Sequence, residues 1–169
     1  MVLKRPFKCP TEIHFTDKTG VLVAEIATGR SAAIVTSPFW ATHPLIQQIS
    51  KHPSICEKVI STVKPNPKVS SLGPLVANLP NVELIIAIGG GSVLDTSKAV
   101  AVLHSLNGDV TALHQHLSHS TALPDGLDIV PIVAIPTTAG TGSEVTPWGT
   151  LWGETGQKYS VSDARLYPS

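Results

Sequence analysis

The stretch LIIAIGGGSVLDTSKAVAVLH, residues 84–104, constrains the fold more strongly than any other part of the sequence. Its apolar run over 84–88 predicts a strand covered on both faces, and the pattern over 93–105 predicts a helix. Because the glycines between them lack a Cβ, the chain can turn tightly and approach a pyrophosphate, whose charge the first amides of the helix favour. We therefore expect this turn to hold a nucleotide, with Ser92 as the N-cap of the helix.

A second loop of similar character follows a later apolar run. The residues IVPIVAI over 129–135 predict a buried strand, which leads into AIPTTAGTGSEVTP over 134–147, a segment rich in glycine and hydroxyl groups. Loops at the carboxyl ends of neighbouring parallel strands open into one crevice. If these two strands are neighbours, the two loops together suit a dinucleotide.

The remaining sequence alternates between strand and helix patterns, which predicts an α/β fold. We expect a Rossmann-like, open, mostly parallel sheet with helices on both faces, formed by residues 1–169 as one domain. The expected elements are a strand over 32–36, a helix over 42–51, a short strand within 55–63, a helix over 68–79 that Gly73-Pro74 interrupts, and, over 148–169, a hairpin followed by an exposed run.

Composition excludes several classes of function. The 12 basic and 12 acidic residues balance, and no basic stripe alternates with aromatic residues, so we expect no nucleic-acid partner. No apolar run is long enough to span a bilayer, and no signal peptide opens the sequence, which indicates a cytoplasmic protein that is not bound to a membrane. Cys9 and Cys56 are too few and too far apart for a disulfide framework.

The sequence gives little support to a metal site or to serine hydrolase chemistry. His114, His116 and His119 form the tightest histidine cluster, but only the last two have the spacing of one helical face, and no acidic residue stands nearby. We therefore expect no metal site and no catalytic residue in this chain. A serine hydrolase is excluded because no GxSxG motif is present.

The pair GGGSVLDTSKAVA and IPTTAGTGSEVTP resembles the paired signatures of the iron-containing, group III, alcohol dehydrogenases. The resemblance runs from about Pro10 to the end and includes IVTS at 34–37, KPNP at 64–67 and QKYSVSDARLYPS at 157–169. It implies an N-terminal hairpin around EIHFTDKTG at 12–20 and a Rossmann-like nucleotide domain. It also implies a C-terminal helical domain, absent from this sequence, that supplies an aspartate and three histidines to Fe(II) or Zn(II).

By this resemblance, residues of the two loops contact the cofactor, NAD or NADP. Residues of the first loop lie along the pyrophosphate and the nicotinamide ribose, and threonines of the second loop face the cofactor from the other side. The implied contacts are Gly90, Gly91, Ser92 and Asp95, then Thr137, Thr138 and Thr141, with Asn66 and Lys158 as secondary candidates. Asp95 has a second interpretation from the residues alone, as the capping-box partner of Ser92.

The residue that ends the first strand bears on the choice of cofactor. Where the family commonly has an acidic residue that binds the adenosine ribose, this sequence has Ser37. A carboxylate there would repel a 2′-phosphate, whereas a serine leaves room for it and can donate a hydrogen bond. NADP is therefore plausible beside NAD.

Two hypotheses about function follow. The first is an NAD(P)-dependent alcohol dehydrogenase or aldehyde reductase of which this chain is a fragment, inactive alone, that supplies cofactor binding. The second is a stand-alone nucleotide-binding module without redox activity. For the complete enzyme we expect a metal-polarised alcohol or aldehyde as substrate, with a primary alcohol, a diol and a phosphonate-bearing aldehyde all open. The face that would meet the second domain is expected to be apolar, which favours a homo-oligomer.

Overall fold

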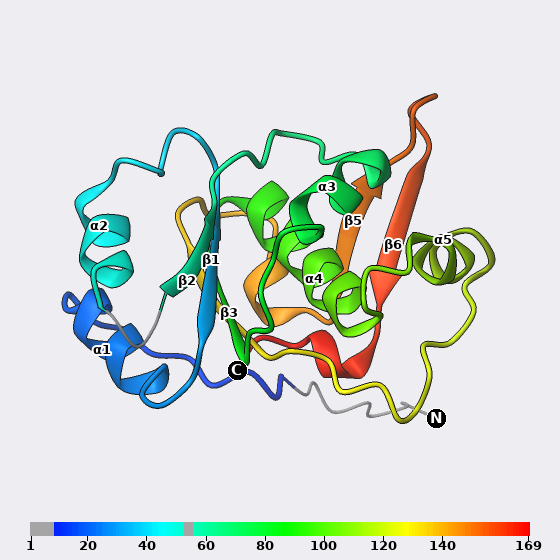
Figure 1. The fold of residues 1–169 in the computed structure, drawn as a ribbon. Coiled ribbons are helices and arrows are strands. Elements are labelled where there is room, and N and C mark those ends of the chain that lie inside the picture. The colour runs from blue at the N-terminus through cyan, green and yellow to red at the C-terminus, as the bar shows by residue number, and fades with distance from the viewer. Residues whose placement is uncertain (1–8, 53–55) are drawn as a thin grey trace, which may run out of the picture.

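A computed structural model describes residues 9–52 and 56–169. Its centre is a four-stranded sheet in the order β2-β1-β3-β4, in which every neighbouring pair is parallel (Figure 1). The strands are β1 (Ala32–Thr36), β2 (Cys56–Ile60), β3 (Leu84–Gly89) and β4 (Ile132–Pro136). A separate antiparallel hairpin consists of β5 (Trp148–Trp152) and β6 (Lys158–Ser162). The predicted open parallel sheet and the predicted hairpin are both confirmed.

Helices cover both faces of the sheet, as Figure 1 shows, with α1 and α2 on one side and α3 and α4 on the other, while α5 lies farther out beside β6. The α-helices are α1 (Thr19–Ile26), α2 (Pro44–Ser50), α3 (Leu72–Val76), α4 (Gly91–Ser105) and α5 (Val110–His119). The 3-10 turns are η1 (Val69–Ser71), η2 (Ser143–Val145) and η3 (Ala164–Leu166). None of the described helices is long and apolar enough to cross a bilayer.

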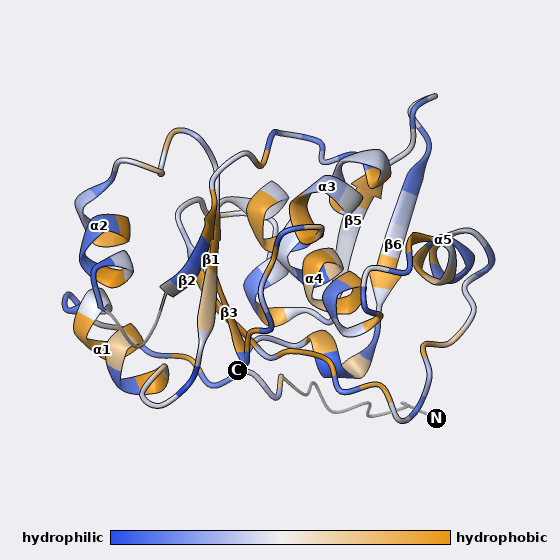
Figure 2. Cartoon of the chain, viewed as in Figure 1, coloured by the Kyte–Doolittle hydropathy of each residue, from blue (hydrophilic) through white to orange (hydrophobic). Residues whose placement is uncertain are grey.

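The core has two parts because side chains of a strand alternate between the faces of a sheet. In β3, Ile86 and Ile88 pack toward α1 and α2, whereas Ile85 and Ala87 pack toward α3 and α4. Every residue of β3 is buried, which explains its unbroken apolar run. Figure 2 shows the same arrangement, with the hydrophobic colour concentrated on the central strands and on the inner sides of the helices.

Several predicted boundaries were wrong. The segment predicted as one helix over 68–79 is η1 followed by α3, which ends at Val76. Gly73-Pro74 lies in the first turn of α3, where a missing backbone N–H costs little, so it does not interrupt the helix. The strand predicted over 129–135 begins only at Ile132, directly after Pro131. The strand predicted within 55–63 is β2, and Ile55 lies outside the described residues.

The N-terminal hairpin is absent from the described residues 9–20, and this expectation was wrong. Residues 9–18 contain no strand, and α1 begins at Thr19. Helix α5, which the sequence patterns did not predict, begins after Asp109, whose side chain accepts a hydrogen bond from the amide of Ala112. This N-cap and the buried Leu113 and Leu117 hold α5 beside the hairpin.

Candidate cofactor-binding site

The two glycine-rich loops meet at one edge of the sheet. Strand β3 pairs with β4 in parallel, so that Gly89 lies opposite Pro136 where both strands end. The amide of Thr137 donates a hydrogen bond of 3.0 Å to the carbonyl of Gly89, which joins the first residues of the two loops. The two strands are therefore neighbours, as the prediction of one shared crevice required.

At Gly90 and Gly91, packing against the second loop leaves little space for any side chain. A Cβ atom on Gly91 would lie 2.5 Å from Cγ2 and 2.8 Å from Oγ1 of Thr141, and one on Gly90 would lie 3.0 Å from Oγ1 of Thr138. Gly90 has φ of −79°, which any residue adopts, so this position requires space and not an unusual backbone. In the second loop, Gly142 has φ of 66°, a conformation that favours glycine. The two loops thus form one packed unit.

Helix α4 starts at this unit, one residue earlier than Ser92. The N-cap is Gly90, whose carbonyl accepts hydrogen bonds from the amides of Val93 and Leu94. The prediction that Ser92 caps the helix was therefore wrong, because Ser92 is already the second helical residue. A helix of this length leaves its first amides without intrahelical acceptors, and its dipole favours an anion at that end. A phosphate bound beside Gly90, Gly91 and Ser92 would be stabilised both by the free amides and by the helix dipole.

Asp95 does not form the predicted capping box, because its partner lies in the other loop. Its Oδ1 accepts a hydrogen bond of 2.8 Å from the hydroxyl of Ser143. Burial raises the pKa of the Asp95 carboxyl, while the hydrogen bonds from Ser143 and from the backbone of Thr150 and the charge of Lys98 act in the opposite direction. Asp95 therefore connects α4 to the second loop and to β5.

Lys98, which the sequence patterns did not single out, lies at the centre of this connection. The residue is 1 % exposed, and its Nζ donates hydrogen bonds to the carbonyls of Ser143 at 2.6 Å, Thr146 at 2.6 Å and Trp148 at 2.8 Å. Burial lowers the pKa of Lys98 to about 8, and the carboxylates of Asp95 and Glu144 oppose that shift. Its position on α4, three and four residues before the buried Ala101 and Val102, is the signal that could have revealed its burial.

The lowered pKa of Lys98 predicts a distinctive dependence of stability on pH. Between pH 8 and pH 10.5 the amine is deprotonated in the folded chain but still protonated in the unfolded one. Stability rises with pH wherever the unfolded state binds more protons, so the free energy of unfolding should rise across this window by about 1–2 kcal/mol more in the wild type than in Lys98→Met. Urea unfolding of both chains at several pH values measures this, and parallel pH profiles would contradict it.

Three other predicted contact residues lie outside the two loops. Ser37 directly follows β1, the neighbour of β3, and therefore lies at the same edge of the sheet as the glycine loop. Asn66 has φ of 53° in the loop after β2, and the next residue, Pro67, accepts a hydrogen bond from the amide of Trp152 at the end of β5. Lys158 lies on the hairpin with its Nζ 4.8 Å from the ring centroid of Trp152. The assignment of all these residues to a cofactor stays a prediction.

One member of the histidine cluster, His116, has a structural role. His116 is buried on α5, where its Nδ1 donates to the carbonyl of Thr121 and its Nε2 accepts a hydrogen bond from the amide of Ser162 on β6. The ring therefore links α5 to the hairpin. Within residues 9–52 and 56–169, no three His, Cys, Asp or Glu side chains lie close enough together to hold a metal ion.

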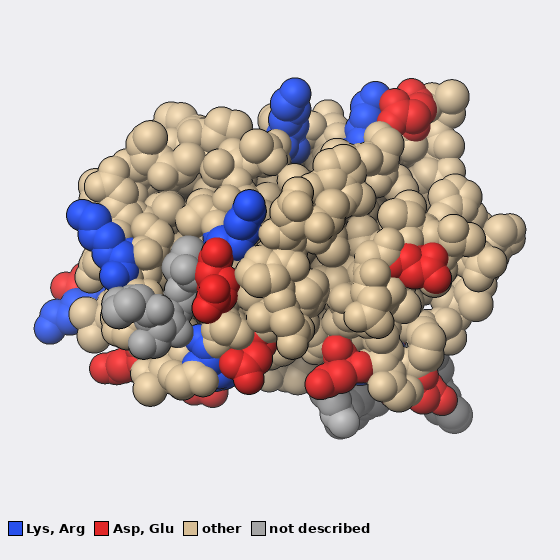
Figure 3. Space-filling model, in the orientation of Figure 1, with Lys and Arg blue, Asp and Glu red and all other residues tan. Residues whose placement is uncertain are grey.

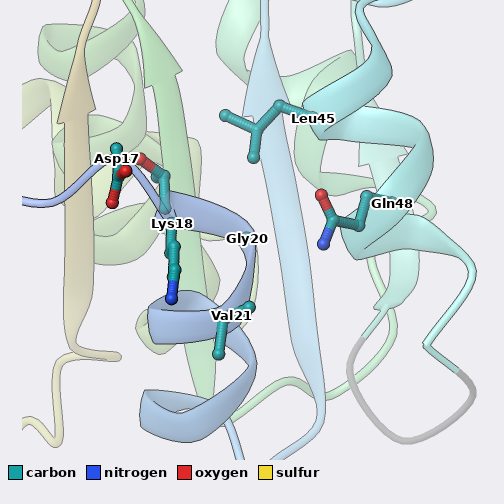
Figure 4. Close-up of a pocket in the computed structure, with 7 residues that line it drawn as sticks. Asp17, Lys18, Gly20, Val21, Leu45 and Gln48 are labelled. Atoms are coloured by element: carbon teal, nitrogen blue, oxygen red, sulfur yellow. The ribbon is translucent and has the colours of Figure 1, made fainter.

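Two hollows lie away from the glycine loops. One, of about 390 Å³, lies between the start of α1 and α2 and is lined by residues that include Lys18, Gly20 and Gln48 (Figure 4). Another, of about 570 Å³, lies between α3, α5 and the hairpin and is lined by residues that include His114 and Trp152. Neither is lined by the loops at 89–92 or 137–143. On the face shown in Figure 3, basic and acidic side chains are scattered among uncharged ones.

Comparison with known proteins gives a consistent result. Residues 10–169 match the family model described as iron-containing alcohol dehydrogenase. The chain is 34 % identical over 158 residues to choline dehydrogenase of Bacillus subtilis, and 40 % identical over 89 residues to phosphonoacetaldehyde reductase of Streptomyces viridochromogenes. These alignments cover 88 % and 52 % of this chain, but only 38 % and 22 % of the two relatives.

The fold is shared with solved structures. Sulfoacetaldehyde reductase of Bifidobacterium kashiwanohense, solved in complex with NAD+, matches with a TM-score of 0.80 and 27 % identity, over 99 % of this chain and 45 % of that one. A 1,3-propanediol oxidoreductase matches with a TM-score of 0.78 and 26 % identity, over 98 % and 44 % of the two chains. This chain thus spans less than half the length of each of these relatives and solved structures.

Proposed function

This chain belongs to the iron-containing alcohol dehydrogenase family, and from that premise we propose that residues 1–169 form the dinucleotide-binding domain of an oxidoreductase acting on alcohols or aldehydes. The observation that carries the proposal is the packed junction of the two loops at the start of α4. There a Cβ atom on Gly91 would collide with Thr141 and one on Gly90 would press tightly on Thr138, and the helix start favours an anion. The NAD+ complex of a structurally similar reductase supports NAD as the cofactor.

The residues present suit a dinucleotide better than a metal. Gly90, Gly91 and Ser92 would hold the pyrophosphate through backbone amides, and Thr137, Thr138 and Thr141 would contact the cofactor from the second loop. Asp95 would lie with the first loop along the pyrophosphate and the nicotinamide ribose, and Asn66 and Lys158 are secondary candidates for cofactor contact. The nicotinamide supplies the hydride acceptor when it is bound. Among the described residues, no three His, Cys, Asp or Glu side chains lie close enough together to hold iron or zinc.

We further propose that the chain self-associates through exposed apolar side chains near its N-terminus. Phe15 is 96 % exposed, and Ile13 and Val21 are about half exposed. Exposed large apolar side chains offer surface for contact with a second copy of the chain. The substrate we propose is a small alcohol or aldehyde. The names of two relatives, phosphonoacetaldehyde reductase and sulfoacetaldehyde reductase, support an aldehyde that carries an anionic group as one candidate.

The test is titration of the purified chain with NADH and, separately, with NADPH. Binding should be saturable and visible both as calorimetric heat and as a change in the fluorescence of the tryptophans, of which Trp148 is half exposed on the hairpin. Chain titrated with ATP serves as a control for nucleotides in general. A chain that binds neither dinucleotide, or binds ATP equally well, would contradict the proposal. Turnover of an alcohol by a protein containing this chain would separate the oxidoreductase from a module without redox activity.

A further inference from the structure

Lys98 is an unusual residue for the interior of a helix. It lies about two turns after Gly91 on α4, and its side chain is almost completely removed from water. A charged side chain is seldom buried in this way unless all its donors find acceptors. An ammonium group has three donors, and Lys98 directs them to three carbonyl oxygens.

The three acceptors lie within six consecutive residues. They are the carbonyls of Ser143 in η2, of Trp148 at the first residue of β5, and of Thr146 between these two elements. Because a 3-10 turn of three residues pairs few of its own carbonyls and Thr146 lies outside any helix or strand, this segment needs partners from elsewhere in the protein. A single side chain of α4 thus supplies the partners for three carbonyls within six residues.

A second set of contacts connects this segment to the cofactor-facing loops. The hydroxyl of Ser143 donates to Asp95 and also lies 3.1 Å from Oγ1 of Thr141. Thr141 in turn packs against Gly91. Farther along, a Cβ atom on Gly149 would lie 2.8 Å from the carbonyl oxygen of Asp95, so β5 rests directly on the backbone of α4. Contacts therefore run from Lys98 through Ser143 to Thr141 at the glycine turn.

We infer that Lys98 is a positioning residue, which fixes segment 143–148 against α4 and thereby holds Thr141 at the glycine turn before the cofactor binds. The inference rests on the proposed function, because it assigns Lys98 a task in cofactor binding. Lys98 does not itself need to contact the dinucleotide. Its effect reaches the site through Ser143 and Thr141.

Hydrogen exchange measured by mass spectrometry tests this inference together with NADH titration. In the wild type, the amides within 143–150 should exchange more slowly than those of the hairpin tip at 153–157, because the segment is held against α4. In Lys98→Met they should exchange at least about 10-fold faster, with β1 and β3 unchanged, and the Kd for NADH should rise about 10-fold or more. Lys98→Gln, which keeps two N–H donors, should fall between. Ser97→Ala is the matched control, because Ser97 is equally buried on α4 but bonds only within the helix.

The outcomes separate this inference from the proposed function. Unchanged exchange at 143–150 in Lys98→Met, or acceleration that extends equally to β1 and β3, would overturn the positioning role. If Lys98→Met does not fold, the exchange rates of Lys98→Gln and of the wild type test the positioning role instead. A wild type in which the amides of 143–150 exchange as fast as those of the hairpin tip at 153–157 would also overturn that role. A wild type that fails to bind NADH contradicts the proposed function. In that case the exchange data still test whether Lys98 fixes segment 143–148 against α4.

Discussion

Replacing Gly91 with valine should reduce the affinity for NADH by about 100-fold or more. The first Cβ atom would already lie 2.5 Å from Cγ2 of Thr141, so the Thr141 side chain or the loop that carries it must shift. The branched side chain would also occupy the space in front of the first helical amides, where the pyrophosphate is proposed to bind. The measurement is NADH titration by calorimetry, with thermal unfolding as a parallel measure of folding.

Two further variants identify which of these effects dominates. Gly126→Val is the matched control, because nothing lies within 4 Å of a Cβ atom at Gly126 and its φ is not in the left-handed region. The double variant Gly91→Ala/Thr141→Gly removes every Thr141 atom that the new Cβ would meet. If it regains stability but binds NADH more weakly than the single variant Thr141→Gly, Gly91 is needed for approach of the phosphate. Normal binding by Gly91→Val would show that this turn is not the cofactor site.

Replacing Ser37 with aspartate should weaken NADPH binding by about 10- to 100-fold and leave NADH binding the same or tighter. Ser37 follows β1 at the edge of the sheet that carries the glycine loop. A carboxylate there can accept hydrogen bonds from a ribose 2′-hydroxyl but repels a 2′-phosphate. Parallel titrations with the two reduced cofactors measure the change in their ratio.

The controls for Ser37→Asp separate local from general charge. Thr111→Asp places the same charge on exposed α5 and should weaken neither cofactor. Ser37→Ala removes the hydroxyl without adding charge and should lower the affinity for NADPH only slightly. An equal loss of NADH and NADPH binding in Ser37→Asp would mean that this residue does not lie near the 2′ position.

Local patterns were sufficient to predict the central sheet and the junction of the loops. The apolar runs at β1 and β3 are unbroken because both strands are covered on two faces, and the glycines after β3 mark where the chain turns into α4. Helix α5 was missed although its buried residues Leu113, His116 and Leu117 have the spacing of one helical face and Asp109 supplies an N-cap, because the segment as a whole is only weakly apolar. The cap at Gly90 was missed because a serine ordinarily offers the better cap.

The contacts of Lys98 and Asp95 could not be predicted from any local pattern. Asp95 binds Ser143, which is 48 residues away, and the carbonyls around Lys98 are 45 to 50 residues away. Which carbonyls a lysine meets depends on how the hairpin docks onto α4, and docking is a property of the tertiary fold. The sequence could show that Lys98 lies on a buried face, but not what lies opposite it.

The hairpin that docks onto α4 also has a consequence for the order in which the chain folds. Strands β5 and β6 are joined by residues 153–157 and can pair after closing one short loop, whereas each parallel pair in the central sheet requires a long crossover. Yet a two-stranded hairpin is barely stable alone in water. We therefore expect the hairpin to form early and dissolve repeatedly, and to persist only once it packs on α4, where Leu151 and Val161 join the core.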